Sequence, residues 1–91
     1  MSLVWRIEVS DDASKELRAL DPPVARRIYA FLTERLAPLG DPRSLGEALK
    51  GSRLGQFWKY RVGDWRIIAT IEDDVMRVLV LRVGNRREVY R

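Results

Sequence analysis

Three cationic side chains with strand-like spacing, Lys59, Arg61 and Arg66, are the residues of this sequence best placed to do chemistry. Side chains alternate between the two faces of a β-strand, so Lys59 and Arg61 share a face. A two-residue turn at Gly63-Asp64 sets Arg61 directly opposite Arg66 on that face. Facing like charges destabilise a sheet, so folding alone gives no reason for this pair. A bound anion gives one, and a solvated face on which the arginines splay apart is the alternative.

A β-hairpin is the element that must position these cations. Aromatic and β-branched residues run from Phe57 to Val62 and from Trp65 to Ile71, with only Gly63-Asp64 between them. Glycine at the first turn position favours a type II′ turn, which needs a positive φ there. In the resulting register the apolar side chains share the face opposite to the cations. These are Trp58, Tyr60, Val62, Trp65 and Ile67.

The composition excludes several classes of active site. The chain has neither histidine nor cysteine, which rules out disulfides, thiol nucleophiles, Ser-His-Asp triads and the usual zinc sites. The densest acidic pair, Asp73-Asp74, is typical of a turn, and a hard-cation site would need more clustered carboxylates. We therefore expect neither a metal nor a cofactor.

The net charge of +4 is unevenly distributed. Residues 1 to 49 hold seven basic and eight acidic side chains, whereas residues 50 to 91 hold ten and five. A basic surface indicates nucleic acid or an acidic protein as partner, and composition does not separate the two. The length of 91 residues predicts a single domain, 1–91. Without a long apolar run or a signal-peptide pattern, we expect a cytoplasmic protein with no membrane association.

An opening strand and two helices are predicted before the hairpin. Alternating apolar residues from Leu3 to Val9 predict a strand with one buried face. Ser10 is a plausible N-cap of a short helix that ends near Leu20. Asp21-Pro22 begins a longer helix, whose apolar stripe reaches Leu36. Joined so tightly, the helices should form a helical hairpin lying on one face of a sheet.

Proline and glycine punctuate a connector from Pro38 to about Gly55, in which Leu45 and Leu49 are expected to pack against the core. The mainly apolar run from Met76 to Val83 predicts a central strand, broken by Gly84. The predicted fold class is therefore α+β with the order β-α-α-β-β-β. In it, the helical hairpin packs on one face of a small, mainly antiparallel four-stranded sheet.

The C-terminal segment is a second place where chemistry is predicted. Arg86, Arg87 and Arg91 surround Tyr90, and an exposed aromatic ring can stack on a base while arginines bind its phosphates. An ordinary charged terminus is the alternative.

Together these residues resemble the RelE family of the RelE/ParE toxin superfamily, the toxins of bacterial toxin-antitoxin pairs. The resemblance covers nearly the whole chain and is carried by two motifs, WKYRVGDWRI at Trp58 to Ile67 and VGNRREVYR at Val83 to Arg91. It implies a RelE-like fold and a small cytoplasmic endoribonuclease that cuts messenger RNA in the ribosomal A site without a metal. It also implies a cognate RelB-like antitoxin as partner. This antitoxin would form a hetero-oligomer with the chain and cover the helical hairpin and the basic face.

Carried over by position, the resemblance implies catalytic roles for Lys59, Arg61, Arg66 and Arg86, with Tyr90 as the stacking aromatic. Further RNA-binding candidates are Lys50, Arg53, Arg87 and Arg91. The chain departs from some relatives in having Arg61 in place of a basic lysine, and from many in having Asn85 in place of a histidine. Asparagine cannot exchange protons as imidazole does, so proton transfer must be achieved differently here.

The implied reaction is attack of a ribose 2′-hydroxyl on the adjacent phosphate. Repulsion by the neighbouring arginines makes Lys59 the better base or electrostatic helper, since an arginine keeps its proton. Arg61 and Arg66 would hold the phosphate, with Arg86 as acid or oxyanion stabiliser. Two alternatives stay open: a ParE-like inhibitor of DNA gyrase, and a catalytically weak relative that only binds its antitoxin.

Overall fold

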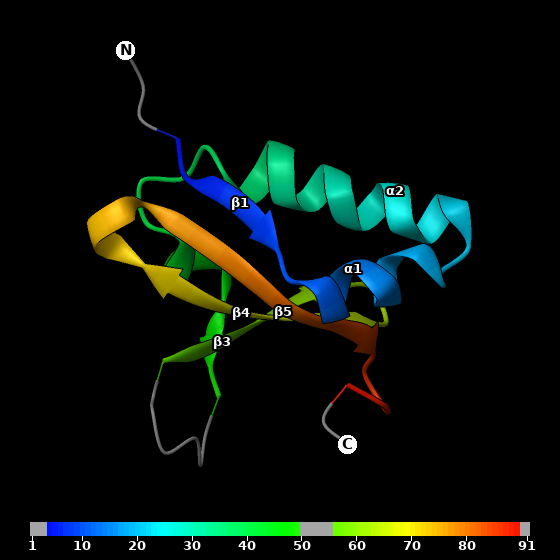
Figure 1. Cartoon of the computed structure of the whole chain (residues 1–91). Coiled ribbons are helices and arrows are strands. Elements are labelled where there is room, and N and C mark those ends of the chain that lie inside the picture. The colour runs from blue at the N-terminus through cyan, green and yellow to red at the C-terminus, as the bar shows by residue number, and fades with distance from the viewer. Residues whose placement is uncertain (1–3, 50–55, 90–91) are drawn as a thin grey trace.

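A five-stranded sheet carries two helices on one face in the computed structural model, which describes residues 4–49 and 56–89 (Figure 1). The strand order is β1-β5-β4-β3-β2. The strands are β1 (Arg6–Val9), β2 (Glu47–Ala48), β3 (Phe57–Val62), β4 (Trp65–Glu72) and β5 (Arg77–Asn85). β1 runs parallel to β5, and the other neighbouring strands are antiparallel. The predicted α+β class and helix placement are confirmed.

The sheet has one strand more than predicted. β2 lies in the segment expected to be a connector, where Glu47 faces Lys59 and Ala48 faces Trp58 of β3. Glutamate and alanine have low strand propensity, so the open edge of β3 rather than the local sequence imposes this pairing. The expectation that Leu45 packs in the core is wrong, because its exposed fraction is 38%. Gly84 does not break the last strand, since β5 continues through Asn85 to pair with Trp65.

Both helices begin where their capping residues predicted. α1 (Asp11–Arg18) starts after Ser10, whose Oγ accepts a hydrogen bond of 3.1 Å from the Ala13 N–H. α2 (Pro22–Ala30) starts with proline at its first position, after Asp21. Among the described residues, no helix is long and apolar enough to cross a membrane.

The second helix continues as a π-helical segment, η1 (Phe31–Leu36). The Ala37 N–H donates to the Leu32 carbonyl at 3.0 Å, five residues back. A spacing of four residues is slightly more than one α-helical turn of about 3.6 residues and slightly less than one turn of the wider π-helix. The two kinds of turn together therefore keep Ile28, Leu32 and Leu36 in line, and all three are buried against the sheet.

The central strand β5 contains a bulge that sets the core. Ile68 of β4 faces Arg82 and the next residue, Ala69, faces Val80, so the intervening Leu81 has no partner on β4. The extra residue allows Val80 and Val83 to be buried in the core although they are three positions apart. The Glu16 carboxylate of α1 then accepts hydrogen bonds from the Val83 N–H at 2.9 Å and from Arg82 Nε at 3.2 Å. This contact fixes the first helix to the sheet.

The hairpin register is confirmed, with Arg61 facing Arg66 and Lys59 facing Ile68. Gly63 has a φ of 60° and Asp64 does not share the positive sign, which is the type II′ arrangement. A Cβ added at Gly63 would lie 2.8 Å from Arg27 Nη2, so the turn also lies close against α2. The register predicted from the local sequence therefore gives the observed pairing of these cations within the hairpin.

Candidate active site

Lys59, Arg61 and Arg66 line one open hollow of about 300 Å³ on the hairpin. We call it the basic hollow, and its other lining residues are Leu45, Glu47 and Tyr60. Its residues come from β2, β3 and β4 and, for Leu45, from the segment that leads into β2. Three cations and a single carboxylate thus face one concave surface, which is suited to binding a phosphate diester.

The two facing arginines of the hollow are held differently. Arg66 Nη1 donates to the carbonyl oxygens of Gly63 and Trp65, each at 2.9 Å, which directs its guanidinium back toward the turn. Within residues 4–49 and 56–89, Arg61 makes no ion pair, and its side chain is exposed. Anchoring one guanidinium on main-chain carbonyls preorganises its charge and leaves the other free to meet a ligand.

Glu47 is the site residue that sequence reasoning missed. Its Oε2 lies 3.6 Å from Lys59 Nζ, and the two residues are cross-strand partners between β2 and β3. The Glu47 side chain is 78% exposed and that of Lys59 35%. Glu47 thus adds one negative charge to the lining of the hollow, beside the three cations. No local signal marked this residue, because its role depends on the connector folding back onto β3.

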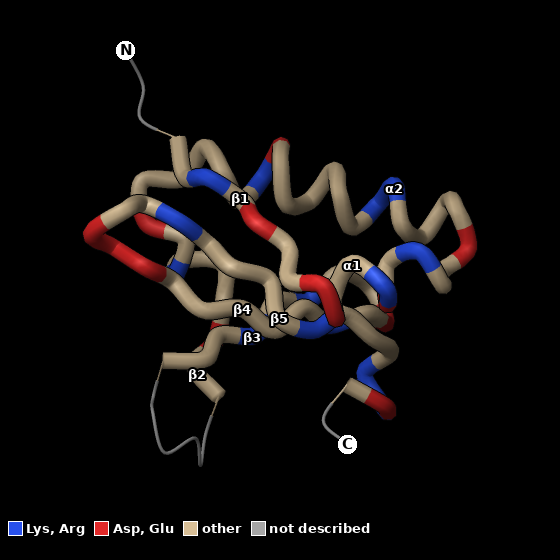
Figure 2. Tube along the Cα trace, viewed as in Figure 1, with Lys and Arg blue, Asp and Glu red and all other residues tan. Residues whose placement is uncertain are grey.

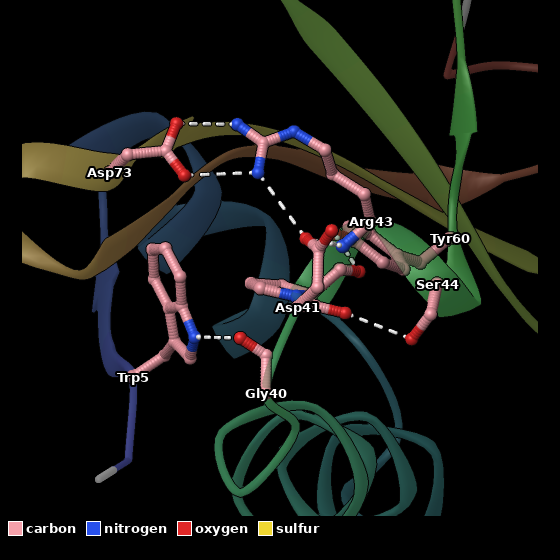
Figure 3. Close-up of polar contacts among 8 residues, drawn as sticks. Trp5, Gly40, Asp41, Arg43, Ser44, Tyr60 and Asp73 are labelled. Carbon is pink, nitrogen blue, oxygen red and sulfur yellow. Dashed lines mark hydrogen bonds and ion pairs between the residues drawn. The ribbon is translucent and has the colours of Figure 1, made fainter.

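A buried tyrosine, Tyr60, and a half-buried arginine, Arg43, hold the connector in place (Figure 3). The Tyr60 hydroxyl donates to the Pro42 carbonyl at 2.9 Å, and burial raises the pKa of Tyr60 to about 12. Arg43 binds Asp73 through two hydrogen bonds of 3.0 and 2.6 Å, and the pKa of Asp73 is lowered by this contact. Arg43 also lies over the Trp58 ring, 5.8 Å from its centroid. These contacts fix the segment that brings Glu47 to Lys59.

The predicted catalytic residue Arg86 does not line the basic hollow. Its main-chain N–H donates to the Asp64 carbonyl at 2.9 Å, which holds the start of the C-terminal segment next to the hairpin turn. It stands two residues beyond Gly84, the partner of Arg66. The exposed Arg87 follows in a turn in which its N–H donates to Asn85 Oδ1 at 3.1 Å. Outside the described residues lie Tyr90, Lys50, Arg53 and Arg91.

Acidic positions gather in the turn between β4 and β5, next to basic positions that pair with them (Figure 2). The 3-10 turn η3 (Asp73–Val75) carries acid at one end of the β4-β5 hairpin, where Glu72 and Asp73 pair with Arg77 and Arg43. The basic hollow lies toward the opposite end of β4, near Gly63. In the described part of the chain, no group of three or more acidic side chains could hold a metal ion.

A family model described as the ParE toxin of the type II toxin-antitoxin system, parDE, matches residues 7–90. The chain belongs to the ParE toxin family. Relatives of this ParE-family chain include toxin RelG and toxin RelE of Mycobacterium tuberculosis, each 26% identical over 87 residues. The alignments cover 96% of this chain, 97% of RelG and 87% of RelE. The resemblance to the RelE/ParE superfamily is therefore confirmed.

Solved structures share the fold of this ParE-family chain. The RelBE2 toxin-antitoxin complex from Mycobacterium tuberculosis matches with a TM-score of 0.83 and 23% identity, over 97% of this chain and 98% of that one. The isolated RelE toxin of E. coli matches with a TM-score of 0.68 and 22% identity, over 89% and 83% of the two chains. At such identities the likeness shows the fold alone, and the predicted RelE-like fold is confirmed.

Proposed function

We propose that this toxin is a ribosome-dependent endoribonuclease that cleaves messenger RNA in the A site without a metal ion. The observation that carries the proposal is the gathering of Lys59, Arg61, Arg66 and Glu47 around one hollow. The mycobacterial relatives named RelE and RelG support the same class of toxin. Cutting translated messages places the protein in the cytoplasm.

The arginines of the hollow would stabilise the transition state. When a ribose 2′-oxygen attacks the neighbouring phosphorus, negative charge grows on the non-bridging phosphoryl oxygens. Arg66 is already oriented by its two carbonyl contacts, and Arg61 is an exposed guanidinium on the same surface. One anchored and one exposed guanidinium group can both meet that growing charge with bidentate hydrogen bonds.

Glu47 and Lys59 would carry the protons. The Glu47 carboxylate accepts the proton of the 2′-hydroxyl as the new oxygen-phosphorus bond forms. Lys59, whose Nζ lies 3.6 Å from the same carboxylate, takes the role of acid in place of the base role predicted from the sequence and donates a proton to the leaving 5′-oxygen as the old bond breaks. The products are a 2′,3′-cyclic phosphate and a 5′-hydroxyl. Of the two roles predicted for Arg86, acid or oxyanion stabiliser, we propose the second, and Tyr90 keeps its predicted role as a base-stacking ring.

An antitoxin is the expected protein partner. The matched structures include toxin-antitoxin complexes named RelBE2 and, from Methanococcus jannaschii, RelB-RelE. We propose that a RelB-like antitoxin forms a hetero-oligomer with this chain and covers the basic hollow. An acidic segment there would relieve the repulsion between Arg61 and Arg66 while blocking the phosphate site.

Induction of the protein alone in a bacterial host tests the proposal. Growth should arrest, and primer extension should find new 5′ ends of messages inside translated codons. Lys59→Ala and Arg66→Ala should abolish both effects, whereas Lys15→Ala, an exposed lysine on α1, should leave them intact. Circular dichroism checks that all variants fold. Unchanged cutting by Lys59→Ala and Arg66→Ala would refute the assigned residues.

A second candidate function follows from the matched family itself, whose description names ParE. A ParE-like inhibitor of DNA gyrase would damage DNA on induction and leave translated messages uncut. The same induction experiment separates the two, with an assay of DNA damage beside primer extension. Absence of any toxicity would favour a relative that only binds its antitoxin.

A further inference from the structure

A second hollow, of about 400 Å³, lies beside the basic hollow at the edge of the sheet. β3 continues beyond the short β2, so its last residues form an open edge opposite α2 and η1. We call the space between them the edge hollow. Its lining includes Arg27, Phe31, Glu34 and Arg35 from the helix, and Arg61 and Val62 from the strand. Its volume falls within the range of about 300–1,000 Å³ typical of ligand pockets.

The edge hollow combines an apolar floor with a cationic rim. Val62 is buried and Phe31 partly buried, with the Phe31 ring packed on Tyr60 at a centroid distance of 5.9 Å. Three guanidinium groups, those of Arg27, Arg35 and Arg61, face a single carboxylate, that of Glu34. None of these three arginines has a carboxylate within 4.0 Å among residues 4–49 and 56–89. A planar, partly apolar ligand that carries negative charge fits such a surface.

We propose that the edge hollow is a nucleotide subsite that binds the RNA residue next to the scissile phosphate. The proposal rests on the ribonuclease function above, because Arg61 lines both hollows and joins them. A strand whose scissile phosphate contacts Arg61 in the basic hollow continues past that side chain. Its next base then lies on the apolar floor, with its phosphate between Arg27 and Arg35.

RNA fits the edge hollow better than an acidic peptide does because of this continuity and because guanidinium planes stack on bases. Asparagine and glutamine, which read the edges of bases through paired hydrogen bonds, are not among the lining residues. The subsite should therefore add affinity with little base preference. Stacking alone favours purines over pyrimidines modestly, since their ring area is larger.

Two ribonucleotide probes of different length distinguish this subsite from the basic hollow. The first is a 2′-O-methyl dinucleotide with one phosphodiester, and the second a 2′-O-methyl trinucleotide with two. The methyl group blocks attack, so the wild-type toxin can be titrated to millimolar concentrations by ¹H–¹⁵N NMR. The trinucleotide should bind more tightly than the dinucleotide. It alone should shift the amide signals of Val62 and Gly63 and the Arg35 side-chain Nε–H signal.

The decisive comparison is between two substitutions on the rim of the edge hollow, one that removes a positive charge and one that removes a negative charge. Arg35→Gln should weaken trinucleotide binding about tenfold, as expected for loss of one charge-assisted contact, and leave dinucleotide binding unchanged. Glu34→Gln should strengthen trinucleotide binding, because it removes the carboxylate of the rim. Arg26→Gln is the matched control, since Arg26 is an exposed arginine of α2 that lines neither hollow. If these substitutions acted only by disturbing the fold, both Arg35→Gln and Glu34→Gln would weaken trinucleotide binding.

The outcomes separate the subsite from the proposed function. If the dinucleotide binds but Arg35→Gln behaves like Arg26→Gln, the subsite is refuted and the ribonuclease proposal stands. If neither probe shifts any signal of the edge hollow, the subsite is refuted, and the ribonuclease proposal is decided separately by primer extension after induction. If a synthetic peptide of alternating leucine and glutamate shifts the Arg35 signal and the trinucleotide does not, the edge hollow binds a protein segment and the nucleotide assignment is wrong.

Discussion

Replacing Tyr60 by phenylalanine should change stability in opposite directions at neutral and at alkaline pH. The side chain is 1% exposed, and its hydroxyl donates to the Pro42 carbonyl at 2.9 Å. At pH 7 the substitution deletes this hydrogen bond and leaves a carbonyl acceptor unpaired, at a cost of about 1 kcal/mol. The pKa of Tyr60 is raised by burial to about 12, from an ordinary 10.0. Its contribution to stability is therefore complete below pH 10 and is lost as the pH rises toward 12.

The size of the alkaline effect follows from the difference between the raised and the ordinary pKa of Tyr60. At about 1.4 kcal/mol per pH unit, the wild type loses roughly 2–3 kcal/mol between pH 10 and pH 12, and Tyr60→Phe loses none of it. The wild type should thus be the more stable protein at pH 7 and the less stable one at pH 12, with equal stabilities near pH 11. Urea unfolding followed by circular dichroism measures both proteins across this range. A stability difference that stays constant with pH would show that the hydroxyl is not buried as described.

Four further predictions concern the support of the site and its chemistry. Glu47→Gln should lower the rate of message cleavage on ribosomes by about 10²-fold, and Glu47→Asp should keep part of it. Asp73→Asn should flatten acid unfolding: Arg43 lowers the pKa of Asp73, so this carboxylate stabilises the fold above pH 4 and ceases to do so at lower pH. Gly63→Ala should destabilise the hairpin by about 1–2 kcal/mol, since its φ of 60° strains an L-residue. Ser10→Ala should cost about 1 kcal/mol through loss of the helix cap, measured like the glycine variant by urea unfolding.

The sequence predicted those parts of the fold that are decided locally. The hairpin register follows from a glycine turn and from side-chain alternation, so the placement of Lys59 and Arg61 on one face could be derived without coordinates. Ser10 and Pro22 marked the helix starts because capping acts within one turn. The mainly apolar sequence from Met76 to Val83 predicted a central strand, and that strand lies between β1 and β4.

The parts that could not be predicted depend on contacts between distant segments. β2 forms because the connector returns to the open edge of β3, and that return is fixed by Tyr60 and Arg43 binding residues far away in the chain. The contact between Glu47 and Lys59 therefore could not be predicted from the residues next to Glu47 in the sequence. The bulge at Leu81 arises where β5 pairs with both β1 and β4, and nothing in the mainly apolar sequence of β5 predicts it.

Unpaired positive charge alone does not locate a functional surface in this molecule. In the part of the chain that the structure describes, Arg18 and Arg26 also lack carboxylate partners, yet both stand on exposed helix positions and line neither hollow. Arg61 differs because it faces Arg66 across the hairpin and borders two concave surfaces at once. Repulsion between facing guanidinium groups has a cost in the free protein that a bound phosphate removes. Concavity together with unrelieved like charge, rather than either alone, is the reason why we propose this end of the hairpin as the place where an RNA backbone binds.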